Sequence, residues 1–313
     1  MKRKIILAGG SGFLGTALAR RFAALGDAVF VLTRSPQNRT DGAKDVAWDA
    51  RVIGEWVSLF EGADVVLNLT GKSVDCRYTE KNRRLITASR VDSTRIVGEA
   101  IAHCKNPPRV WLNASSATLY KHDPVQPADE SGPTGATPEA KDAFSIEVIR
   151  QWERALDEAR TPQTRKVALR ICVVFGTVSG IYPVLRRLAR FGLGGKMGSG
   201  KQFVSWIHEE DFCRAADWLI EHEELSGPIN FAAPNPLTNA EMMQLVRKEC
   251  GAPFGLPATE WMLEIGAFFI RTETELIIKS RRVVPGKLLA SGFQFRFSKL
   301  EDALRNLEHR EEG

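Results

Sequence analysis

The sequence predicts an α/β protein built on a doubly wound parallel sheet of the Rossmann type, with a smaller, mostly helical C-terminal region. Strand-like apolar runs alternate with helical repeats through the first half of the chain, which is the order of βαβ units. The first run, Lys4–Ala8, is followed by three glycines and then by a helical repeat, as in a nucleotide-binding turn. After residue 237 helical repeats dominate.

Composition and charge are those of an ordinary soluble globular protein. The net charge of +5 is spread along the chain, so no basic cluster indicates nucleic acid, and no apolar run is long enough to cross a membrane. The five cysteines lack C-x-x-C spacing and the five histidines are scattered. We therefore expect reduced thiols in a cytoplasmic protein, and no metal site.

The turn after the first strand predicts a cofactor. Gly9, Gly12 and Gly15 lie between that strand and a helix expected at Thr16–Leu25, and a second strand is expected at Ala28–Leu32. Glycine permits a tight turn and lets backbone N–H groups approach a pyrophosphate at the positive end of the helix. We expect a dinucleotide here, held by Gly9, Ser11, Gly12, Phe13, Leu14 and Gly15.

The end of the second strand distinguishes between the two nicotinamide cofactors. NAD-binding proteins place Asp or Glu about 20 residues after the glycines to hold the ribose 2′-hydroxyl. This chain has Thr33, Arg34 and Ser35 there, and a guanidinium pairs with a phosphate whereas a carboxylate repels one. We interpret the three residues as an NADP(H) site; the alternative is a solvated surface arginine.

The remaining elements divide the chain into two predicted domains. Residues 1–176 form the cofactor-binding domain, and 177–313 form an interleaved substrate domain whose residues 203–233 help to complete the sheet. Further strands are expected at Asp64–Leu69, Arg109–Ala114, Val167–Phe175, Phe203–Ile207 and Ile229–Ala232. Further helices are expected at Thr79–Cys104, Ala143–Ala159, Pro183–Phe191, Asn239–Cys250, Thr259–Ile270, Glu273–Ser280 and Leu300–Leu307.

The chain resembles the extended short-chain dehydrogenase/reductases, relatives of the nucleotide-sugar epimerases. The matching motifs are Gly9-x-x-Gly12-x-x-Gly15, Ser115-Ser116-Ala117-Thr118-Leu119-Tyr120, Leu169-Arg170 and Trp206-Ile207-His208-x-x-Asp211. It is similar, more narrowly, to the atypical epimerase-like subgroup with a C-terminal domain of unknown function. That match rests on Asn68-Leu69-Thr70-Gly71, Ser89-Arg90-Val91-x-Ser93-Thr94, Gly194-Gly195-x-x-Gly198-Ser199-Gly200-x-Gln202, Pro234-Asn235-Pro236 and Arg282-Val283-x-Pro285.

The resemblance implies an NADP-binding oxidoreductase acting on a small molecule, anionic or neutral, whose identity the family leaves unassigned. It implies an active-site serine at Ser116. It also implies further cofactor contacts at Leu69, Thr70, Gly71, Arg90, Ala114, Ser115 and Arg170. The oligomeric state stays open.

The chain departs from the family at its proton relay. The superfamily uses Tyr-x-x-x-Lys, in which the lysine lowers the phenol pKa so that the tyrosine passes a proton as hydride moves. None of Tyr78, Tyr120 and Tyr182 has a lysine four residues later. The helix expected to carry the pair reads Phe-Ser-Ile-Glu-Val-Ile at 144–149, so the standard relay is absent.

Three side chains have both a chemical and a structural interpretation. Ser116 either bonds a substrate oxygen or satisfies backbone groups at a strand end. Tyr120, beside Lys121 and His122, either supplies a proton or packs in the core, and packing is favoured. Arg170, at the end of a buried strand, either pairs with a loop carboxylate or contacts the cofactor or substrate.

Two further motifs are weaker indicators of function. The glycine-rich loop at 192–201 either holds an anion through its two lysines and backbone donors or connects the domains. His208 and Asp211 are expected to pack the second domain on the first.

Two functions of different classes fit these patterns. The first is an NADPH-dependent reductase or dehydrogenase, with Ser116 orienting the oxygen and Tyr120 or water supplying the proton. The second is a protein that senses NADP(H) or uses it structurally without catalysis. Nucleotide-sugar epimerases share the predicted fold, but the missing Tyr-x-x-x-Lys relay argues most strongly against that activity.

Overall fold

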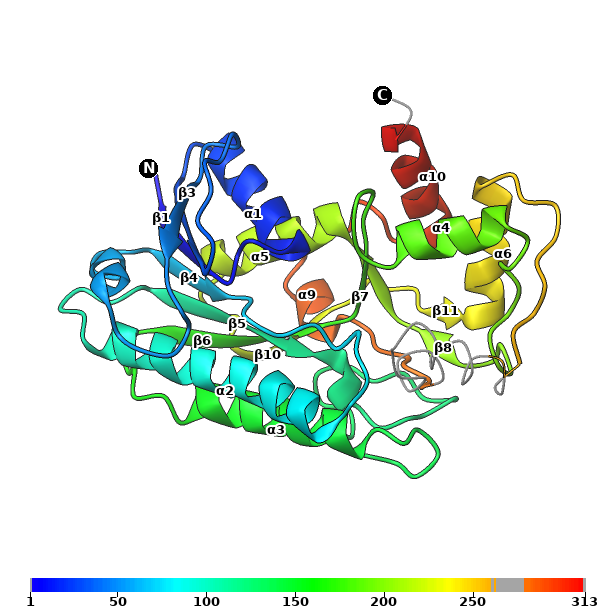
Figure 1. The fold of residues 1–313 in the computed structure, drawn as a ribbon, viewed down its shortest axis with the longest axis horizontal. Coiled ribbons are helices and arrows are strands. Elements are labelled where there is room, and N and C mark those ends of the chain that lie inside the picture. Colours follow the sequence, from blue (N-terminus) through cyan, green and yellow to red (C-terminus); the bar gives the residue numbers. More distant parts are fainter. Residues whose placement is uncertain (1, 260–261, 263–278, 312–313) are drawn as a thin grey trace.

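A seven-stranded parallel sheet forms the centre of the computed structural model, which describes residues 2–259, 262 and 279–311 (Figure 1). The strand order is β10-β6-β5-β4-β1-β2-β3, so the chain winds outward from β1 in both directions. This confirms the predicted doubly wound sheet. The strands are β1 (Lys4–Ala8), β2 (Ala28–Thr33), β3 (Lys44–Ala47), β4 (Val65–Asn68), β5 (Val110–Ser116), β6 (Arg165–Ile171) and β10 (Gly227–Phe231).

Helices cover both faces of the sheet because its strands are apolar on both sides. In β1, Ile5 and Leu7 join one core and Ile6 joins the other, as the two-residue period of a strand requires. The first face is covered by α1 (Phe13–Ala24), α5 (Glu209–Glu221) and α9 (Gly286–Ala290), and the second by α2 (Glu80–Ala102) and α3 (Ala143–Asp157) (Figure 1). One 3-10 turn, η1 (Glu55–Leu59), precedes β4, and another, η2 (Ala117–Leu119), follows β5 directly.

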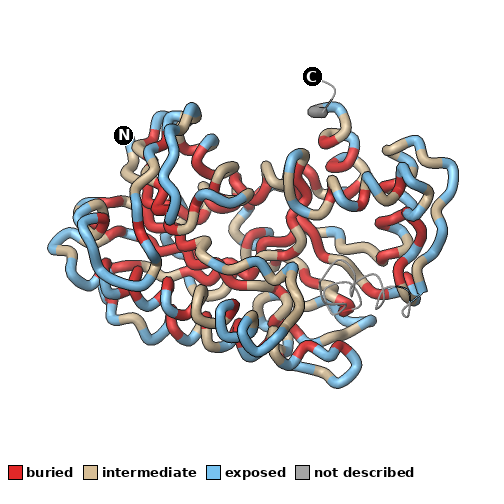
Figure 2. Tube along the Cα trace, viewed as in Figure 1, coloured by how far each residue is buried: buried red, intermediate tan, exposed pale blue. Residues whose placement is uncertain are grey.

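A second core lies beside the carboxyl ends of the strands, and Figure 2 shows buried chain in both halves of the molecule. We call residues 173–208, 233–259 and 295–311 the C-terminal module. Its elements are β7 (Val173–Phe175), α4 (Tyr182–Arg190), β8 (Phe203–Val204), β9 (Trp206–His208), β11 (Leu237–Thr238), α6 (Asn239–Glu249) and α10 (Leu300–Glu311).

Two expectations for the sheet are wrong. The segment Val167–Phe175 is not one strand, because the N–H of Val173 bonds to Ser205 O at 3.2 Å and β7 pairs with β9 outside the main sheet. The expected strand Phe203–Ile207 therefore divides between β8 and β9, and β10 completes the main sheet. Edge strand β3 was not predicted, because its sequence Lys-Asp-Val-Ala has little apolar pattern.

The predicted helices Thr259–Ile270 and Glu273–Ser280 fall almost wholly outside the described residues. Within the described ranges, no helix is both long and apolar enough to cross a membrane. The strand order reverses between β1 and β4, and their carboxyl ends point toward the C-terminal module. Open α/β sheets bind ligands at such a point.

Candidate functional site

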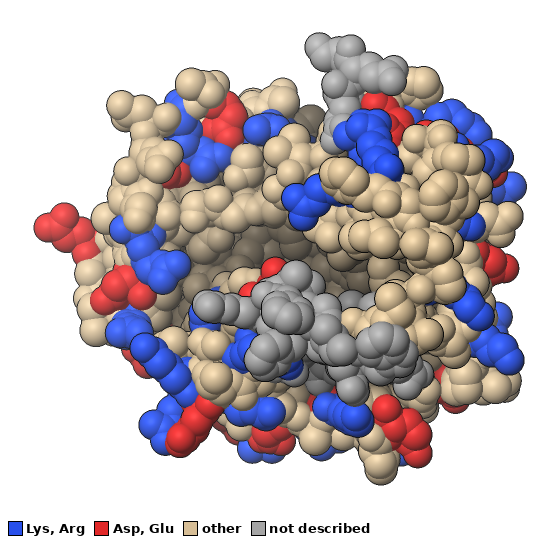
Figure 3. All heavy atoms as spheres, turned by 45° about the vertical axis from the view of Figure 1, so that its right-hand side comes forward, with Lys and Arg blue, Asp and Glu red and all other residues tan. Residues whose placement is uncertain are grey.

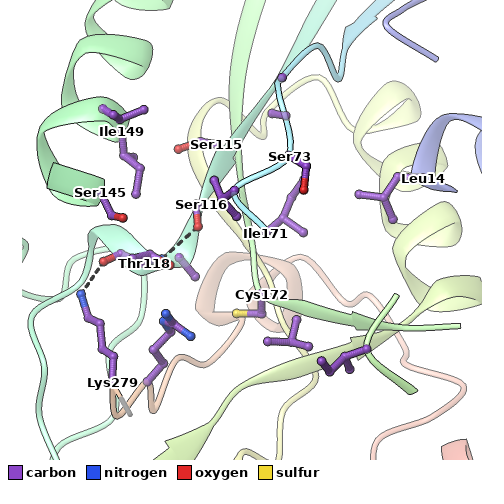
Figure 4. A pocket seen from close by; sticks show the side chains of 18 of the residues that line it. Leu14, Ser73, Ser115, Ser116, Thr118, Ser145, Ile149, Ile171, Cys172 and Lys279 are labelled. Atoms are coloured by element: carbon purple, nitrogen blue, oxygen red, sulfur yellow. Dashed lines mark hydrogen bonds between the residues drawn. The ribbon is translucent and has the colours of Figure 1, made fainter. Parts of the chain in front are cut away.

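A cavity of about 810 Å³ lies at the carboxyl ends of the central strands. Figure 3 shows the surface hollowed between the two halves of the molecule, and Figure 4 shows the wall from close by. Its far wall comes from the C-terminal module, through residues such as Met197, Phe203, Val204 and Met242. Of the predicted site residues, this cavity brings together Gly9, Gly12, Phe13, Leu14, Gly15, Leu69, Gly71, Arg90, Ala114, Ser115 and Ser116.

A second hollow, of about 450 Å³, collects predicted contacts that the first does not. It is lined by Ser11, Thr33, Arg34 and Ser35. Arg20, Arg39, Asp41 and Asp45 line it as well, and both carboxylates are paired with Arg39. Arg34 and Arg20 are exposed. The hollow therefore suits a small anionic group such as a phosphate.

The glycine turn has room for a ligand at one position only. A Cβ on Gly15 would lie 2.3 Å from the Cα of Gly10, and one on Gly9 would lie 2.5 Å from Thr70 Oγ1, whereas nothing lies within 4 Å of a Cβ on Gly12. Thr70 thus packs on the turn and lines neither hollow. Gly12 begins α1 without a side-chain cap, and the first turn holds no acidic residue. The positive end of the helix therefore faces the cavity.

Ser116 satisfies a backbone group at the strand end, which is one of the two roles expected for it, and it also lines the cavity. It ends β5 and lines the cavity, and its Oγ accepts the N–H of Thr118 at 3.2 Å at the start of η2 (Figure 4). The neighbouring Ser115 donates its hydroxyl to Glu153 Oε1 at 2.6 Å. Because Ser116 Oγ is the acceptor of that bond, its hydroxyl proton can be donated to a ligand oxygen in the cavity.

Tyr120 and Arg170 lie away from both hollows. Arg170 bonds both carboxylate oxygens of Glu153 at 2.9 Å and the Tyr120 hydroxyl at 3.0 Å, and that hydroxyl donates to Asn230 Oδ1 at 2.8 Å. Both side chains are buried, and burial raises the pKa of the Tyr120 phenol. The geometry fits packing for Tyr120 and pairing for Arg170, with a helix carboxylate in place of the expected loop carboxylate.

The helix without the proton relay does face the cavity. Phe144, Ser145, Val148 and Ile149 of α3 all line it (Figure 4 labels Ser145 and Ile149). The missing tyrosine and lysine positions therefore lie at the site, occupied by side chains that cannot form the relay.

Sequence reasoning missed the contribution of residues 279–281. Lys279 is buried and donates to Thr118 O at 2.6 Å (Figure 4). It also pairs with the buried carboxylate of Asp142. Lys279 and Arg281 both line the cavity. An isolated lysine 137 positions from its partner gives no periodic signal, so no pattern in the sequence could have paired the two.

The two weaker motifs, the glycine-rich loop and the segment with Asp211, both make hydrogen bonds to the protein backbone. In the glycine-rich loop, the N–H groups of Gly195 and Gly198 donate to backbone carbonyls at 256–258, so these donors are not free for an anion. Asp211 is fully buried and accepts the N–H of Phe297 at 2.8 Å, which joins α5 to the C-terminal module.

A cysteine thiol on the cavity wall has a raised pKa that does not suit a catalytic nucleophile. Cys172 lies in the cavity wall after β6, and burial raises its pKa to about 12. A thiol with that pKa stays protonated near neutral pH and is a poor nucleophile. Among the described residues no cluster of His, Cys, Asp and Glu could hold a metal ion.

Comparison with known families gives two matches. The model of the NAD dependent epimerase/dehydratase family matches residues 5–232, and that of a domain of unknown function, DUF1731, matches residues 258–307. The chain is 30% identical to the human epimerase family protein SDR39U1 over 309 residues, which cover 97% of this chain and 99% of that protein. It is 31% identical to the epimerase family protein YfhF of Bacillus subtilis over 314 residues, covering 97% of each.

Two solved structures resemble this chain over nearly its whole length. Human SDR39U1 (isoform 2), crystallised with NADPH, superimposes with a TM-score of 0.86 at 28% identity, over 97% of this chain and 99% of that one. A nucleoside-diphosphate sugar epimerase from Corynebacterium glutamicum superimposes with a TM-score of 0.76 at 27% identity, over 97% of this chain and 57% of that one.

Removal of the Tyr120 hydroxyl tests whether it is structural. Tyr120→Phe leaves a donor of Arg170 and the amide oxygen of Asn230 without their buried partner. We expect the free energy of unfolding to fall by about 1–3 kcal/mol in urea denaturation, with Ser131→Ala, at an exposed loop position, as the control. Unchanged stability would contradict the structural assignment.

Proposed function

Because the chain belongs to the NAD dependent epimerase/dehydratase family and ends in a DUF1731 match, we propose that it is an NADP(H)-dependent oxidoreductase acting on a small carbonyl or alcohol compound. One observation carries the cofactor part of the proposal: an uncapped helix N-terminus and an exposed arginine lie in two hollows on either side of one glycine turn. The NADPH bound to the human relative supports it.

We assign the two ends of the cofactor to the two hollows. The pyrophosphate belongs at the start of α1, where Gly12 leaves space and the helix supplies N–H donors. The 2′-phosphate belongs at Arg34 and Arg20 in the smaller hollow. A carboxylate at the end of β2 would repel that phosphate, and this chain has Thr33 and Arg34 there.

The chemistry needs one hydride and one proton. When bound, NADPH supplies the hydride to a carbonyl carbon. Ser116 donates its hydroxyl to the carbonyl oxygen and so holds the substrate in place. The proton comes from water in the cavity, because the Tyr120 phenol is buried between two partners and its pKa is raised. The products are an alcohol and NADP⁺.

The second candidate is an NADP(H)-binding protein without catalysis. It is favoured by the cavity face of α3, which carries Phe144 and Ser145 where the superfamily carries its tyrosine. Epimerisation also needs proton removal from a sugar hydroxyl, and that face offers no group for it. An activity screen separates these functions.

Charge reversal at Arg34 tests the cofactor. Arg34→Glu replaces a charge-assisted hydrogen bond to the 2′-phosphate by repulsion, so the preference for NADPH over NADH should reverse. Such bonds contribute about 1.5–3 kcal/mol, and titration calorimetry of both cofactors measures the change. Arg51→Glu, at an exposed arginine outside both hollows, is the control. Equal affinity of the parent protein for NADPH and NADH would refute the assignment.

Truncation of Ser116 tests catalysis. We expect the parent protein to oxidise NADPH with members of a panel of aldehydes and ketones, followed by loss of absorbance of the reduced nicotinamide. Ser116→Ala should lower kcat about a hundredfold, as loss of one oxygen-binding donor does in other enzymes. Full activity of Ser116→Ala would rule out the assigned site. A parent protein saturated with NADPH that reduces nothing on the panel would favour the protein without catalysis.

A further inference from the structure

Two loops at one end of the C-terminal module expose four large apolar side chains. Phe191 and Leu193 follow α4, and Phe254 and Leu256 lie in the segment after α6, each with between 50% and 76% of its surface exposed. Figure 1 shows both segments at the right-hand edge of the molecule, away from the main sheet. Phe191 and Phe254 are the two exposed aromatic residues of the described chain. We call these four residues the apolar tip.

Backbone geometry holds the apolar tip in place without burying it. Gly192 ends α4 with a φ of 74°, and the next N–H, that of Leu193, donates to Leu188 O at 2.8 Å, as in the Schellman end of a helix. The N–H of Leu256 donates to Gly192 O at 2.8 Å, and a Cβ on Gly192 would lie 3.0 Å from the Phe254 ring. The two loops are therefore joined through Gly192, and their large side chains face solvent.

The chain segments that form the apolar tip carry positive charge and no acidic side chain. Residues 178–208 and 250–259 contain no Asp or Glu, and the first range contains five Lys and Arg residues. Two of these arginines share the carboxylate of a glutamate in α10. The other three, Arg187, Lys196 and Lys201, are exposed, and no carboxylate of the described residues forms an ion pair with them. Their charge is therefore available to an anionic partner beside the apolar tip.

Charge distinguishes between the occupants that such a surface could have. A symmetric contact between two copies of the chain would bring each apolar tip, with its cations, against the same tip of the other copy, where like charges repel. A membrane that contains anionic lipids offers negative head groups above an apolar layer. Phenylalanine and leucine side chains flanked by Lys and Arg are the pattern that binds such an interface.

We propose that the apolar tip docks on the surface of a membrane that contains anionic lipids. Its four apolar side chains enter the boundary between head groups and acyl chains, and Arg187, Lys196 and Lys201 contact the head groups. Such docking needs no helix that crosses the membrane. The proposal goes beyond the proposed function, because none of the four tip residues lines either hollow.

Co-sedimentation of the whole protein with lipid vesicles tests the proposal. We expect binding to vesicles of about one-third phosphatidylserine and two-thirds phosphatidylcholine, weak binding to phosphatidylcholine alone, and release by salt. Replacing both rings, in Phe191→Ser with Phe254→Ser, removes the inserted aromatic surface and should lower the partition coefficient about tenfold or more. Arg187→Ala should lower it about fivefold, and on the anionic vesicles alone, as for the loss of one basic residue near such a surface.

The control variants change exposed residues elsewhere. Leu25→Ser and Arg51→Ala lie in the half of the molecule that carries the main sheet and should leave vesicle binding unchanged. A parent protein that does not sediment with the anionic vesicles overturns the proposal, and so does binding that the double phenylalanine variant retains in full. If that variant does not fold, Arg187→Ala decides by its loss of binding to the anionic vesicles.

Two further measurements identify the other occupants. A dimer in sedimentation velocity that the double phenylalanine variant abolishes would assign the apolar tip to a second copy of the chain. Binding to polyglutamate without binding to anionic vesicles would assign it to an acidic protein. Either result overturns the proposal.

Discussion

The close approach of backbone at the glycine turn is the constraint on which the site depends. Gly15 lies against Gly10 and Gly9 against Thr70, with no room for a side chain at either glycine. This contact fixes the start of α1 over the end of β1 and leaves its first N–H groups uncapped toward the cavity. Because β1 lies where the strand order reverses, the same contact places the positive helix end at the edge of the sheet where the large cavity lies.

Polar contacts between residues far apart in the sequence hold the rest of the cavity wall in place. Lys279 reaches Thr118 O, and the Thr118 N–H in turn holds Ser116 Oγ, so a residue from the far end of the chain fixes the turn that carries the proposed substrate contact. Behind that turn, Arg170 pairs with Glu153 and bonds the hydroxyl of Tyr120, so the tyrosine that was one candidate proton donor is held in the core. The site therefore combines a cofactor surface made locally with a substrate wall assembled from distant segments.

This division explains what the sequence could and could not predict. The glycine turn and Arg34 were proposed as site residues because each depends on strands, a turn and a helix that adjoin in sequence, whereas Ser116 was proposed from the family motif. The break between β6 and β7 at Cys172 was not predicted, because one apolar run continues through two strands that pair in different sheets. The Lys279–Asp142 pair and the contact of Arg90 with Trp152 join residues far apart in the chain, and such pairings leave no local pattern.

The most direct test of the account is a crystal structure of this protein with NADPH. We predict the pyrophosphate at the N-terminus of α1, the 2′-phosphate at Arg34, and the nicotinamide ring in the large cavity with its C4 facing the space beside Ser116. Density for the cofactor with its 2′-phosphate away from Arg34, or with the nicotinamide outside the large cavity, would contradict the account.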